Sequence, residues 1–363
     1  MFPQRYKLIQ SIQKKRSSKV ITYITSSRQG LEVQMAMDVV RQIYPHVKHA
    51  SKDGGKNKID LFLYSNGGDG VVPWRLVTLI REYSSEFNVI VPFNAFSAAT
   101  STALGADNII MHDMGMLGPT DPSITTPYNP IDPLTKKRIP ISVEDVMAYR
   151  DLIREDFLGK KKEEKPDEST MLEAIRFLSA DIGRIHPLAL GAVKRSHSQA
   201  KMLAKKLLEL HMSSDKKAEI DKIIEDLTSK LFYHGHPINR NEAKELKLKV
   251  ANCGEEADDV WELYCLYEKE LKILEPFNPV AEFYDKVTDF GIGVNGAIVK
   301  SKIAIKDVKL AYIESEFGSN YVETGFVVEG IKGIDQTGKI FENFNVTQTK
   351  GGWVFVKPPT DVA

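Results

Sequence analysis

The chain has 363 residues, which is enough for one large domain or two smaller domains with sizeable cores. Lys and Arg together number 49, as do Asp and Glu, so the net charge does not indicate binding to nucleic acid or to an anionic membrane. The two cysteines, Cys253 and Cys265, fit neither a zinc site nor a disulfide framework, and we expect a reducing, cytoplasmic location.

Targeting and cofactor signals are not found along the chain. Residues 1–19 are basic and lack the apolar segment of a secretory signal. No window approaches the roughly 18 uninterrupted apolar residues of a membrane helix, so we expect no membrane span. No metal-ligand or nucleotide motif is present, and we therefore expect neither a metal nor a cofactor.

Strands and helices alternate along the first third of the chain. The apolar periodicity predicts a helix over residues 4–16, a strand over 19–25 and a helix over 31–44. A buried strand, 59–64, then enters the glycine-rich turn 65–70, which an amphipathic helix over 71–83 follows. Further strands are predicted at 89–92 and 108–111, on either side of a helix of small residues. This alternation implies βαβ crossovers and a mostly parallel sheet covered on both faces, the α/β class.

The composition changes after residue 121. Residues 127–140 form a proline-rich connection, and helices are predicted at about 142–157, 168–183, 187–211, 215–232 and 239–248. Residues 290–357 alternate apolar and polar positions between glycine turns, which indicates a small antiparallel module. We therefore divide the chain into a domain over 1–252 with a helical insertion at about 142–232, a helical linker over 253–279 and a β-rich module over 280–363.

Ser97 stands at the start of the small-residue helix. A hydroxyl there lies beside unpaired backbone N–H groups and the positive end of the helix dipole, which favour a developing negative charge. The upstream turn contains Gly67 and Gly68, and glycines at such a joint can expose backbone N–H groups to form an oxyanion hole. Without further evidence, Ser97 could be only the N-cap of a buried helix, and the glycines could form only an ordinary tight turn. The turn lacks Gly-Lys-Ser/Thr, so it is not a phosphate-binding loop.

These two stretches together resemble the Clp/crotonase superfamily, in the branch of signal peptide peptidase A, and are most similar to the serine dehydrogenase proteinase family. The motifs that carry the resemblance are Ser65-Asn66-Gly67-Gly68, Ala95-Phe96-Ser97-Ala98-Ala99, Leu117-Gly118-Pro119-Thr120-Asp121-Pro122 and His234-Gly235-His236-Pro237-Ile238. They cover roughly residues 15–250. The resemblance implies a Clp/crotonase-like core, with Ser97 as nucleophile and the N–H groups of Gly67 and Gly68 as oxyanion donors.

A serine nucleophile needs a base within hydrogen-bond reach, itself held by a third group. The resemblance implies the order Ser, Asp, His along the chain, which places the carboxylate at Asp121 and the imidazole in the loop that holds His234 and His236. We take His234 as the base and Asp121 as its orienting partner, with His236 as the alternative base.

A lysine base, as in signal peptide peptidase A, is the other possibility. Lys136 and Lys137 lie at a suitable distance downstream of the serine, although adjacent cations beside prolines are typical of a solvated loop. A lysine acts as a base only where burial lowers its pKa.

The sequence therefore favours an ATP-independent serine endopeptidase that cleaves peptides or unfolded protein segments through an acyl-enzyme on Ser97. The resemblance also implies a homo-oligomer. Three alternatives stay open: a Ser-Lys dyad peptidase, a crotonase-type acyl-CoA enzyme, which needs the glycines but no nucleophilic serine, and a non-catalytic scaffold.

Overall fold

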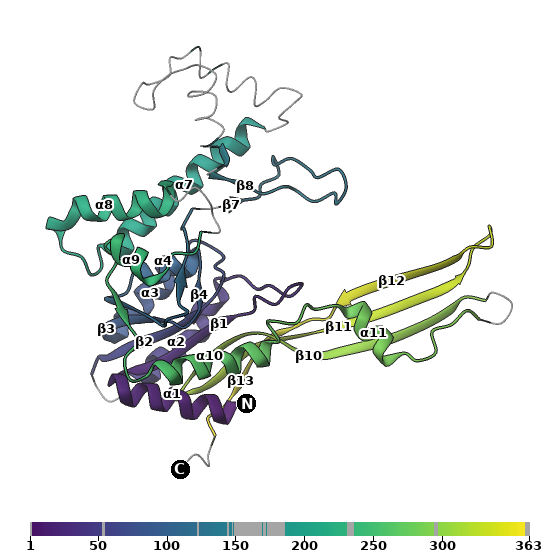
Figure 1. Cartoon of the computed structure of the whole chain (residues 1–363), viewed down its shortest axis with the longest axis horizontal. Coiled ribbons are helices and arrows are strands. Elements are labelled where there is room, and N and C mark those ends of the chain that lie inside the picture. Colours follow the sequence, from purple (N-terminus) through teal and green to yellow (C-terminus); the bar gives the residue numbers. More distant parts are fainter. Residues whose placement is uncertain are drawn as a thin grey trace.

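The computed structural model describes residues 2–52, 55–121, 123–143, 186–230, 236–293 and 297–359, together with residues 145, 146, 148, 169 and 172. Helices cover both faces of one large sheet, and a β arm projects from the sheet on one side (Figure 1). The predicted helices over 142–157 and 168–183 lie almost entirely outside the described residues.

The centre of the sheet is parallel. Its strands are β1 (Lys19–Thr25), β2 (Asn57–Tyr64), β3 (Ser84–Val91), β5 (Asn108–Met111) and β9 (Val250–Asn252). They lie side by side in the order β1-β2-β3-β5-β9, each parallel to its neighbour. Helices lie between successive parallel strands along the chain, because parallel neighbours need a crossover connection. The α/β class is confirmed, and the predicted parallel arrangement holds for these five central strands.

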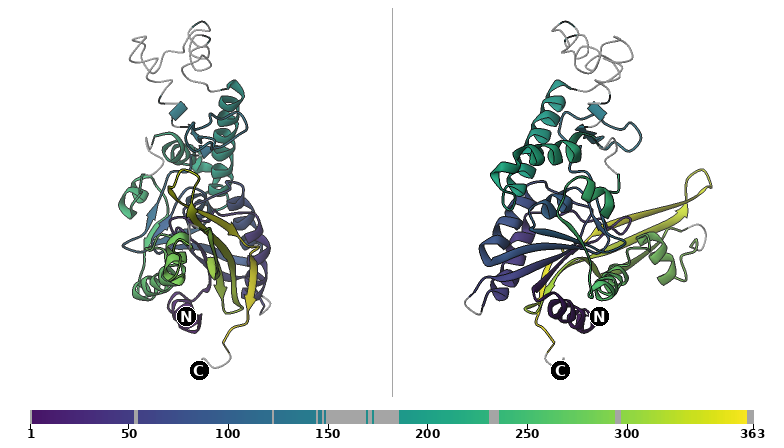
Figure 2. Two further views of the ribbon diagram at one scale, coloured as in Figure 1. Left: turned by 90° about the vertical axis from the view of Figure 1, so that its right-hand side faces the viewer. Right: turned by 60° about the vertical axis from the view of Figure 1, so that its left-hand side comes forward.

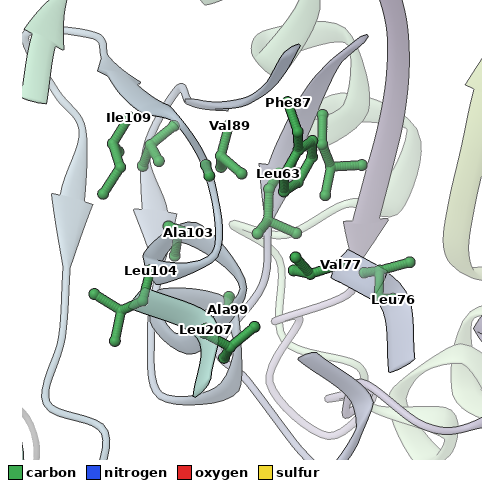
Figure 3. Packing of buried hydrophobic residues seen from close by; sticks show 14 of the residues in the cluster. Leu63, Leu76, Val77, Phe87, Val89, Ala99, Ala103, Leu104, Ile109 and Leu207 are labelled. Carbon is green, nitrogen blue, oxygen red and sulfur yellow. The ribbon is translucent and has the colours of Figure 1, made fainter. Parts of the chain in front are cut away.

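Two hydrophobic cores lie on the two faces of this sheet. Because side chains alternate along a strand, Leu61 enters one core and Phe62 the other. The covering helices are α2 (Asp38–Ala50), α3 (Val72–Tyr83) and α4 (Ala98–Leu104) on the first face, and α1 (Phe2–Arg16) and α10 (Ala257–Leu271) on the second. Figure 3 shows the first core, where Ala99 and Ala103 of α4 lie close to the strands. Burial on both faces explains the continuous apolar strands in the sequence.

The helix predicted over 31–44 begins later than expected. Helix α2 starts at Asp38, and residues 31–36 instead run as an extended segment toward the glycine turn. Met35 is fully buried and forms an isolated parallel bridge with Gly68. The apolar periodicity of residues 31–44 was therefore misleading, because Met35 is buried by this long-range pairing and not by a helix face.

The C-terminal strands continue the core sheet. They are β10 (Val299–Ser315), β11 (Gly318–Ile334), β12 (Ile340–Gln348) and β13 (Gly352–Val356). The strands pair antiparallel with one another, as the alternation predicts, and the end of β10 also pairs antiparallel with β1. The outer halves of β10, β11 and β12 form the projecting arm, with α11 (Pro279–Lys286) packed on it (Figures 1 and 2).

A second group of elements stands at the carboxyl ends of the parallel strands, where α/β sheets bind ligands. It contains the paired β4 (Asn94–Ala95) and β6 (Met116–Leu117), the paired β7 (Ser123–Ile124) and β8 (Ile141–Ser142), and the helical segments α7 (Pro187–Leu208), η2 (Ser214–Lys216), α8 (Lys217–Glu225), η3 (Asp226–Lys230) and α9 (Arg240–Glu245). Leu207 of α7 packs against α4 (Figure 3). Among the residues described, no helix is both long enough and apolar enough to span a bilayer.

Candidate active site

Ser97 is the N-cap residue of α4 and has an unusual backbone conformation. Its φ is 52° and its ψ is −114°, a combination that L-residues rarely adopt. Holding a residue in such a backbone conformation costs about 1–3 kcal/mol, so it persists only where the surrounding structure imposes it. The turn before it is fixed on both sides, since Phe96 N–H donates to Ser65 O at 2.9 Å and Ala99 N–H donates to Phe96 O at 2.9 Å. The result is a sharp strand-to-helix turn with the serine at its tip.

Ser97 faces Gly67 directly. A Cβ atom added at Gly67 would lie 2.8 Å from Ser97 Cβ and 3.0 Å from Ala98 N. The φ of Gly67 is 97°, a conformation that glycine adopts without steric cost. The glycine at this position is therefore required for two reasons, backbone conformation and the close approach of the serine.

The backbone amides around Ser97 differ from the expectation in one respect. Gly67 N–H, expected to be an oxyanion donor, donates instead to Ser65 Oγ at 3.1 Å. The amides of Gly68 and Ala98 have no acceptor in the part of the chain that the structure describes. Ala98 is the first residue of α4, where an N–H lacks an intrahelical acceptor. Gly68 and Ala98 are consequently the two amides available to a ligand oxygen beside Ser97.

The extended segment before α2 fixes the glycine turn. Met35 N–H donates to Gly67 O at 2.8 Å, and Asp69 N–H donates to Met35 O at 2.9 Å. These two bonds hold the peptide units on both sides of Gly68, which lies so close to Met35 that any Cβ would clash with its backbone. The Gly68 amide is thereby held in a fixed position.

A cavity of about 540 Å³ opens in front of these groups. Its wall includes Ser97, Gly68, Ala98 and Thr120, together with the extended segment at 32–34 and the side of α7 at Ser196 to Leu203. The charged residues in its described lining are Glu32 and Asp69. Ser97 is partly exposed there, and its hydroxyl has no hydrogen-bond partner among the described groups. The hydroxyl is therefore accessible to a substrate.

Asp121 lies in the turn after β6 and is fully buried. The preceding residues are tied to two other elements: Thr120 N–H donates to Leu227 O at 3.0 Å, and Leu117 and Ile238 exchange two backbone hydrogen bonds of 2.9 and 2.8 Å. The Leu117–Ile238 bridge is antiparallel. It brings the segment that follows the HGH loop alongside the segment that leads to Asp121.

None of the described candidate bases lies in the wall of the Ser97 cavity. His234 lies outside the described residues. His236 Nε2 lies 2.7 Å from Glu242 Oε1, and His236 is not among the residues that line the cavity. Lys136 and Lys137 are exposed and do not line the cavity either. An exposed lysine ammonium is solvated, so the geometry gives no support to a Ser-Lys dyad.

His197 is a further histidine near the site that the sequence analysis did not single out. It lies on α7 between the cavity-lining residues Ser196 and Gln199, is only 6% exposed, and its Nδ1 has no hydrogen-bond partner in the described structure. Burial lowers its pKa, as do Lys201 and Lys194, while the carboxylate of Asp121 acts in the opposite direction. No motif marks His197; only the placement of α7 against the Asp121 turn brings it to the site.

The part of the chain that holds the glycine turn and Ser97 matches a family of serine proteinases. Residues 1–155 match the family model of ClpP-like SDH-type serine proteinases. This family model is the one that the glycine and serine motifs predicted.

Two relatives from Methanocaldococcus jannaschii match a larger part of the chain. The uncharacterized protein MJ0137 is 29% identical over 267 residues, 72% of this chain and 78% of its own length. The uncharacterized protein MJ1495 is 24% identical over 268 residues, 72% of this chain and 76% of its own length.

Two solved structures of the 1510-N membrane-bound stomatin-specific protease are also similar to this chain. One is a serine-to-alanine variant, with 15% identity, a TM-score of 0.36, and coverage of 64% of this chain and 81% of that one. The other is a variant in complex with a substrate peptide, with 16% identity, a TM-score of 0.34, and coverage of 64% and 76%.

Proposed function

We propose that this chain is an ATP-independent serine endopeptidase that cleaves peptides or unfolded protein segments through an acyl-enzyme on Ser97. The observation that carries the proposal is the position of Ser97, strained at the tip of its turn and exposed to a cavity beside the unpaired amides of Gly68 and Ala98. Two N–H groups without an acceptor in the described structure, beside a serine hydroxyl, suit the oxyanion of a tetrahedral intermediate.

In the proposed reaction, Ser97 Oγ attacks the scissile carbonyl carbon while a base takes its proton. The carbonyl oxygen becomes an oxyanion that accepts hydrogen bonds from Gly68 N–H and Ala98 N–H. The base then protonates the leaving amine. In the second half of the reaction, the base takes a proton from water, the water attacks the acyl carbon, and Ser97 Oγ leaves with that proton. Gly67, for which we had expected a donor role, instead holds the turn through Ser65.

We propose His234 as the base and Asp121 as its orienting carboxylate, with His236 as the alternative. Support comes from the antiparallel bridge between Leu117 and Ile238. Asp121 lies four residues after Leu117, and His234 lies four residues before Ile238 in the sequence. The pair formed by His236 and Glu242 favours His234 over His236.

The homo-oligomer also remains a proposal, which rests on family analogy. Likewise, the division into a core domain over 1–252, a linker and a module over 280–363 is a proposal. The antiparallel character of residues 299–356 supports a distinct module, whereas the pairing of β10 with β1 joins it to the core sheet.

The test combines active-site labelling with cleavage. A fluorophosphonate probe should label the wild-type chain and not Ser97→Ala, and His234→Ala should lose labelling by at least 100-fold, whereas His236→Ala should retain it. An internally quenched peptide with blocked termini should be cut at an internal bond at the same rate with and without ATP. Labelling that survives in Ser97→Ala, or cleavage only at a terminus, would contradict the proposal.

A further inference from the structure

A second cavity, of about 250 Å³, lies at the opposite end of α4 from Ser97. The C-terminal part of this helix, with Ala103 and Leu104, forms one wall, and Leu208, Ile223 and Leu248 belong to the others. It shares no lining residue with the Ser97 cavity. Helix α4 is seven residues long, or roughly 10 Å at 1.5 Å per residue. One short helix thus forms part of the wall of both cavities.

The floor of this cavity is apolar. Ala103, Leu104, Ala106 and Leu208 are each at most 3% exposed, and Leu248 is also buried. These side chains offer no hydrogen bond to a ligand, so an aliphatic chain suits the floor. The volume is below the range of roughly 300–1,000 Å³ that is typical of pockets for drug-sized molecules, which indicates a small ligand.

The rim of the cavity is positively charged. Three lysines line it, Lys216, Lys247 and Lys249, against one carboxylate, Glu219. Lys216 Nζ lies 3.9 Å from Glu219 Oε1, at the limit of an ion pair. Lys247 and Lys249 have no ion-pair partner in the described part of the chain. An anionic group at the rim would therefore meet two cations that no carboxylate of the described residues neutralises.

His211 adds a polar group to the wall. The distance from His211 Nε2 to Leu104 O, near the end of α4, is 2.9 Å, so this nitrogen carries a proton and donates. His211 Nδ1 is buried and has no hydrogen-bond partner among the described groups. Burial lowers the pKa of His211, as do Arg81 and Lys249, against the hydrogen bond to Leu104 O and the carboxylate of Asp107. His211 therefore lines the cavity as a neutral imidazole, whose ring signals report on a ligand bound there.

We propose that this cavity is a binding site for a small monocarboxylate with an unbranched apolar chain, of the medium-chain fatty acid type. The apolar floor takes the chain, and the carboxylate lies between Lys247 and Lys249. Because the site is separate from the Ser97 cavity, binding can be measured on a chain that has no peptidase activity. The carboxylate site and the proposed peptidase function can therefore be tested independently.

The test is calorimetric titration of the full chain, as the Ser97→Ala variant, with octanoate as the probe. We expect saturable binding at one site, with 1-octanol and acetate each at least ten-fold weaker, because each lacks one half of the proposed ligand. The double variant K247Q/K249Q should bind octanoate at least five-fold more weakly. The matched control is K14Q/K300Q, which removes two exposed lysines elsewhere and should bind octanoate as the parent does.

A second measurement localises the ligand. In a titration followed by NMR, octanoate should shift the ring signals of His211 and leave those of the exposed His186 unchanged. The proposal is overturned if octanoate does not bind, if 1-octanol binds as tightly, if K247Q/K249Q binds octanoate as tightly as the parent, or if the His211 signals do not move.

Discussion

Replacing Gly67 by alanine tests whether the glycine turn and the serine turn fit together as described. The added Cβ would lie 2.8 Å from both Ser97 Cβ and Phe96 O, in a backbone conformation with φ of 97°. The conformation costs about 1–3 kcal/mol, and inserting a methyl group into a packed contact costs a further 1–3 kcal/mol. We therefore expect Gly67→Ala to lower the free energy of unfolding by about 2–6 kcal/mol. Displacing the nucleophile should slow its reaction by about 100-fold.

The same loop supplies the control. A Cβ atom at Gly70 would meet nothing within 4 Å, and Gly70 has no positive φ. Gly70→Ala should therefore change the unfolding free energy by no more than about 1 kcal/mol and leave the reaction of Ser97 unchanged. Urea unfolding followed by tryptophan fluorescence and the rate of fluorophosphonate labelling measure the two effects. If Gly67→Ala matches Gly70→Ala in both assays, the close approach of Gly67 to Ser97 is wrong.

Three further predictions concern Ser97, Asp121 and His46. Ser97→Gly should be more stable than Ser97→Ala by about 1 kcal/mol in urea unfolding, because glycine relieves the positive φ, whereas at Ser101, inside α4, glycine should be less stable than alanine by about 1 kcal/mol. The opposite sign at Ser97 would contradict the strained turn. Asp121→Asn should lower the rate of peptide cleavage by about 10⁴-fold with near-native stability if Asp121 orients the base, and an unchanged rate would remove it from the mechanism. Burial lowers the pKa of His46 from 6.5 to about 4, against the hydrogen bond with Asn320, which raises it. The unfolded chain then binds this proton more tightly, so the stabilisation is fully present above pH 6.5 and is lost as the pH falls toward 4, by roughly 3 kcal/mol in total. His46→Gln should remove this part of the pH dependence, and an unchanged slope between pH 6.5 and 4 would show that His46 does not cause it.

The elements nearest the proposed nucleophile were largely predictable from the sequence. Strands 19–25 and 108–111 have the predicted bounds, and the helix predicted over 71–83 begins one residue later. These segments carry their own signals: apolar runs, glycines at the turn, and small residues in the helix that packs on the sheet. The helix predicted over 31–44 failed at its first half, because Met35 is buried by its pairing with Gly68.

The amides at the site could not be assigned from the sequence. Gly67 and Gly68 look equivalent in the chain, yet Gly67 N–H is bonded to Ser65 Oγ, whereas Gly68 N–H is available. The difference arises from the side chain of a neighbouring residue and from the strand-like contact with Met35. Such choices depend on the direction in which each peptide unit points, which residue types do not specify.

The sequence by itself determined the α/β class, the glycine turn at 65–70 and the short helix that begins after Ser97, because these follow from periodicity and from residues that interact locally. Only the tertiary structure decided which distant segments meet: Met35 at Gly68, Ile238 at Leu117, His197 near Asp121, and β10 beside β1. Those contacts join segments far apart in the chain, and they are selected by the packing of helices on the two faces of one sheet, which no local pattern encodes.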